Sequence, residues 1–142
     1  MCLPPWGTHA AMRIPVRLHA ASEPFLAIVL IVMPWILGYD DSDSATIVSV
    51  AAGVVVLLVG MSTRWRLSLV KLIPQRVHGL LDMGLGVLLV LLPFILGYTE
   101  ETGATVFHIV MGLGFAASGA LTDWDRDDLM HPGGDARHRT VA

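Results

Sequence analysis

The stretch VHGLLDMGLGVLLVLLPFILGY, residues 77–98, decides the fold of this chain, because apolar side chains fill almost all of it. His78 and Asp82 are the only Asp, Glu, Lys, Arg or His residues in the stretch. At 1.5 Å per residue, a helix of this length crosses a hydrocarbon core of about 30 Å. The run Val87–Leu92 is apolar on every side, which excludes the alternating pattern of a membrane β-strand. The stretch therefore predicts a transmembrane helix.

Three further apolar stretches predict transmembrane helices at about residues 18–39, 45–62 and 104–121. Over all 142 residues, 54% are hydrophobic and 15% are charged, against roughly 25% charged in a soluble domain. This composition and a mean hydropathy of +0.67 disfavour a soluble enzyme and a disordered chain. A net charge of −3 provides no basic surface for nucleic acid. The predicted fold class is an all-α membrane protein with four transmembrane helices.

The chain repeats itself after 59 residues without a gap. Residues 14–65 and 73–124 are identical at 17 of 52 aligned positions. Two spans return the chain to its starting side, so both copies have the same orientation, as in parallel membrane repeats. We therefore expect two tandem helical hairpins related by a pseudo-two-fold axis. The remaining parts are a flexible leader at residues 1–13, in which Met12 is a second candidate start, a basic linker at residues 66–72 and a polar tail at residues 125–142.

A shared signature ends the first helix of each copy. Its proline lacks an N–H and favours a kink or a helix end, and its glycine suits the left-handed residue that follows a helix. Its tyrosine and tryptophan suit a membrane interface. We interpret the signature mainly as a helix stop with an aromatic belt, and alternatively as a recognition or gating element. Its residues are Pro34, Trp35, Gly38 and Tyr39 in the first copy and Pro93, Phe94, Gly97 and Tyr98 in the second.

This hairpin resembles the SPW-repeat family, small bacterial and archaeal membrane proteins named for Ser-Pro-Trp in the first of two transmembrane helices. The resemblance covers residues 13–124 as two copies. The chain departs from the family pattern at the serine position, which holds Met33 and Leu92, and at the second tryptophan position, which holds Phe94. The resemblance implies a fold and a membrane location, and it implies no particular activity.

One group of ionisable residues is a candidate functional cluster. In each copy a histidine precedes an acidic residue by four positions, which puts both side chains on one helix face. The pseudo-two-fold axis could bring both pairs together at the end of the bundle where the first helix of each copy begins, which is the expected cytoplasmic end. Ionisable groups within membranes favour a functional interpretation, whereas solvation or pairing with arginine near the boundary is the structural alternative. The cluster comprises Arg17, His19, Glu23, Arg76, His78 and Asp82. The second copy has the full R-x-H-x-x-x-D pattern, which resembles one in family members, and the first copy has Glu23 at the acidic position.

We predict neither a metal ion nor another cofactor for this cluster. One histidine per helix is a weak ligand signal, and the chain has no C-x-x-C-H motif. His108, at the opposite end of the fourth predicted helix, is not expected to join the cluster. The central parts of all four predicted helices lack charged and histidine side chains, which disfavours an ion pathway through one protomer.

The sequence favours a membrane protein without enzymatic activity. The chain has no phosphate-binding loop, no G-x-S-x-G and no H-E-x-x-H motif. The leading hypothesis is a scaffold or interaction protein of the cell membrane. The alternative is a small proton- or ligand-handling protein, for transport or cofactor binding, that uses the candidate cluster. Expected partners are the lipid bilayer and either a second copy or another membrane protein, reached through small-residue stripes such as Ala45, Ser49 and Gly53.

The loop charges predict the orientation. All nine Lys and Arg residues lie before the first predicted helix, between the second and third, or after the fourth. The loops Asp40–Ser44 and Thr99–Gly103 hold only acidic charges. The positive-inside rule then places both termini in the cytoplasm of a multi-pass protein of the cell membrane.

Reporter fusions test this orientation. Fusions after Ser42 and Thr102 should report a location outside the cell, and fusions after Arg66 and Arg126 a cytoplasmic one, because basic loops stay on the cytoplasmic side. Paired alkaline phosphatase and green fluorescent protein fusions provide the measurement. Fluorescence from either acidic loop would contradict the orientation.

Overall fold

A computed structural model describes residues 13–64 and 68–124 of the chain. Within these residues it contains four long helices, each apolar enough to cross a membrane, which confirms the predicted fold class. The predicted leader up to residue 12, residues 65–67 around the start of the predicted linker, and the predicted tail lie outside the described residues. The helices are α1 (Val16–Leu37), α2 (Asp43–Ser62), α3 (Gln75–Leu96) and α4 (Thr102–Leu121).

All four helices begin two residues before their predicted starts, and α1 and α3 also end two residues early. The early ends follow from Gly38 and Gly97, which adopt left-handed φ angles of 69° and 72°. The next backbone N–H, that of Tyr39 or Tyr98, donates to the carbonyl oxygen of Pro34 or Pro93 at 3.0 and 3.1 Å. Both helices continue past the proline until this turn. The glycine, as predicted, is therefore the residue that ends each helix.

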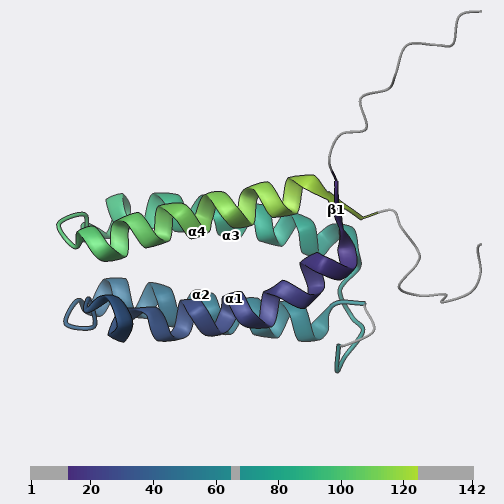
Figure 1. Cartoon of the computed structure of the whole chain (residues 1–142), viewed down its shortest axis with the longest axis horizontal. Coiled ribbons are helices and arrows are strands. Elements are labelled where there is room, and N and C mark those ends of the chain that lie inside the picture. The colour runs from purple at the N-terminus through teal and green to yellow at the C-terminus, as the bar shows by residue number, and fades with distance from the viewer. Residues whose placement is uncertain (1–12, 65–67, 125–142) are drawn as a thin grey trace, which may run out of the picture.

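The helices form two layers, each a hairpin of neighbouring helices. Figure 1 shows α1 beside α2 in one layer and α3 beside α4 in the other. Contacts within each hairpin greatly exceed those between the hairpins. The turns after α1 and α3 lie together at one end of the molecule, which we call the hairpin end. The opposite end, which carries residues 13 and 124, we call the termini end.

Short backbone pairings tie the hairpins together at the termini end. Strand β1 (Ile14–Pro15) pairs in parallel with β2 (Thr122–Asp123). An isolated parallel bridge joins Thr63 to Ile73. Both pairings connect the start of one 59-residue copy to the end of the other. As a result, the first turn of α1 lies beside the end of α4 (Figure 1).

The middle of the bundle is apolar both inside and outside. Its buried side chains include Leu30 of α1, Val56 of α2, Leu89 of α3 and Phe115 of α4. Large apolar side chains such as Phe25 and Leu58 are more than 60% exposed on the outer surface. A helix that is apolar on every side suits a lipid environment. The outward faces therefore match the membrane location that composition predicts.

Small residues bring the helices of each hairpin close together. Ala45, Ser49 and Gly53 of α2 are all buried. A Cβ atom on Gly53 would lie 2.7 Å from the carbonyl oxygen of Ala27 in α1. On the other hairpin, a Cβ atom on Gly86 would lie 2.5 Å from the carbonyl oxygen of Gly112 in α4. These stripes therefore pack within the hairpins.

Two glycines of α3 provide a matched test of this packing. Gly86→Ala should lower the free energy of unfolding by about 1–3 kcal/mol, because the added methyl group overfills the contact with α4. Gly84→Ala should change it little or raise it slightly, since nothing lies within 4 Å of its added Cβ. Unfolding in detergent followed by circular dichroism measures both. Equal losses in the two variants would contradict the packing role.

Candidate functional site

Four of the six predicted cluster residues meet inside the bundle at the termini end. His19 and Glu23 come from α1, and His78 and Asp82 come from α3. Each is at most 4% exposed. One nitrogen or oxygen atom from each residue lies within 4.8 Å of the corresponding atoms of the other three. We call these four residues the His/carboxylate cluster.

The shortest contacts in the cluster cross between the hairpins. His78 Nε2 lies 2.5 Å from Glu23 Oε1, and His19 Nε2 lies 2.9 Å from Asp82 Oδ2. The contacts within each helix, from His19 to Glu23 and from His78 to Asp82, are both 3.3 Å. The two Nε2 atoms are 3.4 Å apart. Helical spacing therefore puts each histidine near its own acid, and packing of the hairpins puts it nearer to the other one.

Hydroxyl groups hold the far side of each imidazole. Thr63 Oγ1 donates to the carbonyl oxygen of Val59 at 2.7 Å and lies 2.8 Å from His78 Nδ1. The threonine has a single hydroxyl proton, so His78 Nδ1–H must be the donor in the second contact. In a neutral imidazole this leaves Nε2 without a proton, facing the cluster.

His19 is held in the related way by Thr122 of β2 and Ser118 of α4. Thr122 Oγ1 donates to the carbonyl oxygen of Ser118 and lies 3.2 Å from His19 Nδ1. Ser118 Oγ lies 2.7 Å from the same nitrogen. Thr63 and Thr122 are 59 residues apart, so each copy supplies the threonine that orients the histidine of the other copy.

Trp124 covers the cluster at the termini end. Its ring centroid lies 4.9 Å from that of His19 and 5.7 Å from that of His78. Its Nε1–H donates to the carbonyl oxygen of Gly119 at 2.8 Å. A Cβ atom on Gly79 would lie 2.6 Å from the indole, so glycine is what admits the ring here. The indole thus shields both imidazoles.

The two arginines of the predicted cluster lie at the surface, unlike the other four residues. Arg17 and Arg76 are exposed, although each occupies the helix that carries one His and acid pair. The carboxylates meet the imidazoles, and they are not solvated at the helix ends. The structural alternative raised by the sequence, solvation near the membrane boundary, does not describe these buried side chains.

A second polar network closes the hairpin end. His108 Nε2 lies 2.7 Å from Ser49 Oγ, and its Nδ1 lies 3.0 Å from the Tyr98 hydroxyl. The Tyr39 hydroxyl lies 2.8 Å from Ser49 Oγ. Burial raises the pKa of Tyr39 and raises that of Tyr98 to about 12, so both phenols stay protonated. As predicted, His108 does not join the His/carboxylate cluster.

The signature residues divide between the core and the surface. Tyr39 and Tyr98 are buried, which corrects the expectation of an interfacial belt, because their hydroxyls find partners inside the bundle. Trp35 and Phe94 are 59% and 60% exposed, as a belt residue would be. Pro34 and Pro93 are buried at the helix ends described above.

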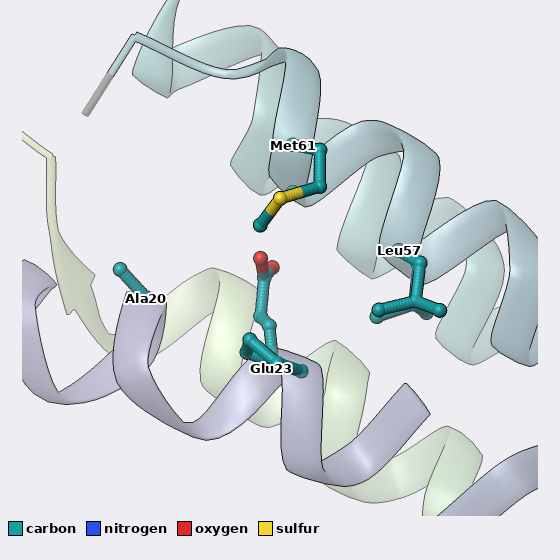
Figure 2. Close-up of a pocket in the computed structure, with 7 residues that line it drawn as sticks. Ala20, Glu23, Leu57 and Met61 are labelled. Atoms are coloured by element: carbon teal, nitrogen blue, oxygen red, sulfur yellow. The ribbon is translucent and has the colours of Figure 1, made fainter. Parts of the chain in front are cut away.

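A small pocket of about 20 Å³ adjoins the cluster between α1 and α2. This volume suffices for one water molecule or ion. Figure 2 shows the Glu23 carboxylate pointing across the pocket toward Met61. In the described part of the chain, Glu23 Oε2 has no hydrogen-bond partner, although it is buried. Asp82 Oδ2, despite its closeness to His19, makes no contact with hydrogen-bond geometry among the same residues.

This arrangement offers ligand atoms that converge on one point. Two imidazole nitrogens and two carboxylates are the donor types that bind protons and metal ions in proteins. Sequence reasoning missed the supporting residues Thr63, Ser118 and Trp124. A signal existed for two of them, since Thr63 matches Thr122 and Trp65 matches Trp124 in the repeat. Nothing in the repeat identifies Ser118, which aligns with Val59.

Comparison with known proteins places this architecture in one family. A family model described as the SPW repeat domain matches residues 17–122, most of the chain. No curated protein and no solved structure matches.

The support of His78 by Thr63 can be tested by an isosteric change. Thr63→Val should lower the free energy of unfolding by about 1 kcal/mol, because it leaves the buried His78 Nδ1–H without its acceptor. Thr46→Val, which removes a hydroxyl 3.3 Å from the Tyr39 carbonyl oxygen, should cost much less. Denaturant titration in detergent measures both variants. A smaller loss for Thr63→Val than for Thr46→Val would contradict this role.

Proposed function

The chain belongs to the SPW repeat family, and on this premise we propose that it is a non-enzymatic protein of the cell membrane that binds a small cation in its His/carboxylate cluster. This is the ligand-handling alternative of the two hypotheses that the sequence raises. The cluster has two carboxylates, two imidazoles and no nucleophile aimed at a substrate-sized space. Its geometry therefore supports binding of an ion and offers no support for turnover of a substrate.

One observation carries the proposal: the contact of each histidine Nε2 atom with a carboxylate oxygen of the other hairpin. His78 Nε2 lies 2.5 Å from Glu23 Oε1. A bare ring nitrogen and a carboxylate oxygen are both electron-pair donors, so they repel at that distance. A positive charge between them turns the repulsion into attraction. Because the Nδ1–H of His78 already donates to Thr63, that charge must sit at Nε2, as a proton or as a metal cation that enters the cluster.

Burial makes the need for a cation greater. Ionisable side chains inside a membrane bundle are costly unless paired. Two ionised carboxylates in a space 4.8 Å across repel each other strongly. A bound cation offsets this repulsion and satisfies Glu23 Oε2, which has no hydrogen-bond partner among the described residues.

The bundle is suited to hold the ion and not to pass it across. Between the His/carboxylate cluster and the Tyr39–His108 network, the buried side chains of the described helices are apolar, as with Leu30, Val56 and Phe115. An ion has no polar partners over that distance, and the cost of crossing is correspondingly high. We therefore favour a binding site over a transport pathway through one protomer.

A bound cation would act as a clamp between the hairpins. Direct contact between the two hairpins is sparse, whereas each cluster residue contacts a residue of the opposite hairpin. Ligands drawn from α1 and α3 would therefore couple the position of one hairpin to that of the other. The stability of the bundle should then depend on the cation.

The proposal also includes the orientation of the protein in the membrane and its partners. The positive-inside rule supports a cytoplasmic location for both termini, so the cluster would lie near the cytoplasmic face. The exposed apolar surfaces support the lipid bilayer as the main partner. Those same surfaces are available to a second copy or to another membrane protein. Nothing in the composition favours nucleic acid.

The proposal predicts stabilisation by at least one small cation. In detergent, chelator-treated protein is heated in the presence of Na⁺, K⁺, Mg²⁺, Ca²⁺, Mn²⁺, Co²⁺ or Zn²⁺ at constant ionic strength. At 100 times its dissociation constant, a cation that binds only the folded state adds about 2.7 kcal/mol of stability. The unfolding temperature of the wild-type protein should therefore rise with at least one of these cations.

A matched pair of variants locates the effect. Glu23→Gln combined with Asp82→Asn keeps the shape of the cluster but removes its negative charges, and should abolish the rise. Asp40→Asn combined with Asp41→Asn removes the same number of carboxylates from the exposed loop after α1, and should keep it. If no cation stabilises the wild-type protein more than the cluster variant, the proposal is wrong.

A further inference from the structure

We propose that the cation is a divalent transition-metal ion, of which Zn²⁺ fits best, bound by His19 Nε2, His78 Nε2, Glu23 and Asp82. This inference rests on the proposed function and specifies the ion. Four observations support it: the burial of the four ligands, the distances between their atoms, the hydroxyl groups that contact the imidazoles, and the net charge of the cluster.

Most separations between the ligand atoms are close to the edges of a four-coordinate zinc site. Zinc binds imidazole nitrogen and carboxylate oxygen at about 2.0–2.2 Å, which sets the edges of its coordination tetrahedron at about 3.3–3.5 Å. The distance between the two Nε2 atoms is 3.4 Å, and the contacts within each helix are 3.3 Å. The contact of His19 with Asp82 is 2.9 Å. To bind zinc, the 2.5 Å separation of His78 and Glu23 has to widen by about 0.8 Å, and that of His19 and Asp82 by about 0.4 Å. The two carboxylate oxygens, which lie within 4.8 Å of each other, have to approach to the same edge length.

The hydroxyls behind the imidazoles prepare the correct ring nitrogen. A metal-bound histidine usually donates its other N–H to a fixed acceptor, which orients the ring. Thr63 Oγ1 takes this position at His78, and Thr122 Oγ1 takes it at His19. The hydroxyl of each threonine donates its own proton to a backbone carbonyl oxygen. The Nε2 lone pair of a neutral His78 is therefore directed at the centre of the cluster. His19 presents Nε2 in the same way when its Nδ1–H donates to Ser118 Oγ, 2.7 Å away, or to Thr122 Oγ1.

The charge of the cluster matches a divalent ion. Two neutral imidazoles and two carboxylates carry a net charge of −2, so one divalent cation makes the buried site neutral. If protons occupy both Nε2 atoms beforehand, one divalent cation replaces two protons, and the net charge stays zero. A monovalent ion would leave a buried negative charge, which is costly in an apolar bundle.

The donor set selects among divalent ions. Ca²⁺ takes six to eight oxygen ligands, and Mg²⁺ requires near-octahedral oxygen coordination, so neither suits a compact site with two ring nitrogens. Imidazole nitrogen suits zinc and its neighbours in the transition series. The four ligand atoms also lie within 4.8 Å of one another, which leaves no space for a porphyrin between the imidazoles.

The pocket beside Glu23 supplies an access path. It is lined by Ala20, Glu23 and Pro24 of α1 and by Gly60 and Met61 of α2, among others. Pro24 has no N–H, so the carbonyl oxygen of Ala20 lacks its usual helical donor beside this space. In the second hairpin the aligned residue is Met83, whose Cγ packs against Gly119. The two copies therefore differ, and the open side is that of the unpartnered Glu23 Oε2.

The test uses the full-length protein in detergent after chelator treatment and buffer exchange. Titration with Co²⁺ should produce the strong visible absorption of a four-coordinate cobalt site, and one equivalent of Zn²⁺ should abolish it, because zinc binds such sites more tightly. Elemental analysis after gel filtration should find one Zn²⁺ per chain. His78→Gln should eliminate the four-coordinate spectrum.

Two further variants separate ligands from supporting and incidental residues. Thr63→Val should keep the four-coordinate cobalt spectrum and weaken Zn²⁺ binding about 10–100-fold, because it removes only the group that orients His78. His131→Ala combined with His138→Ala, outside the described residues, should leave binding unchanged. Loss of binding in this tail variant would assign the metal to the tail and overturn the site. Should His78→Gln fail to fold, Glu23→Gln should also eliminate the four-coordinate cobalt spectrum and tests the site in its place.

The outcomes distinguish the two proposals. If Mg²⁺, Ca²⁺, Na⁺ or K⁺ stabilises the protein through the cluster carboxylates while Zn²⁺ and Co²⁺ do not bind, the cation clamp stands and the transition-metal site is wrong. If no cation stabilises the wild-type protein, both are wrong. A cobalt spectrum that is six-coordinate, or unchanged by His78→Gln, also overturns the transition-metal site.

Discussion

The structure depends on one constraint: ionisable side chains buried in an apolar bundle must find their partners within it. His19 and Asp82 solve this for each other across the hairpins, as do His78 and Glu23. Water in a soluble protein could have solvated any of these groups at the surface. In a bundle whose outward face is apolar, the groups turn inward. The two hairpins therefore meet in a fixed relation at the termini end, where the β1–β2 pairing and the Thr63–Ile73 bridge also join them.

The two polar networks of the bundle differ in how completely they satisfy themselves. At the hairpin end, Tyr39, Ser49, His108 and Tyr98 form a continuous chain of hydrogen bonds. Each ring nitrogen of His108 has a hydroxyl partner, so the network is complete without a ligand. At the termini end, Nδ1 of each imidazole faces a hydroxyl and Nε2 faces the carboxylates, but Glu23 Oε2 has no hydrogen-bond partner in the described chain. A complete network stabilises a fold, whereas an incomplete one indicates a binding site.

Two departures from the internal repeat fall beside the polar networks. Ser49 and His108 occupy equivalent positions in the two copies. The hydroxyl of one and the ring nitrogen of the other lie 2.7 Å apart and form a hydrogen bond. Pro24 and Met83 are also equivalent, and the pocket adjoins the proline. The residues that support the cluster, Thr63 and Thr122, are identical in both copies. The identical threonines thus hold both histidines in the same way. The differing pairs produce the pocket beside Pro24 and the hydrogen bond between Ser49 and His108.

The amino-acid sequence by itself determined the four helices, their glycine ends and the pairing of each histidine with an acid on one helix face. These features depend on local periodicity and backbone chemistry, which act over a few residues. Only the tertiary structure decided that each histidine lies nearest to the acid of the other hairpin, that Ser118 and Trp124 enclose the rings, and that Tyr39 and Tyr98 turn inward. The contacts of the histidines with Glu23 and Ser118 join residues 55 and 99 positions apart, and even the contacts of Tyr39 and Tyr98 cross to the next helix, 10 positions away. Periodicity specifies which face of a helix a residue occupies, but the packing of the two hairpins selects which faces meet.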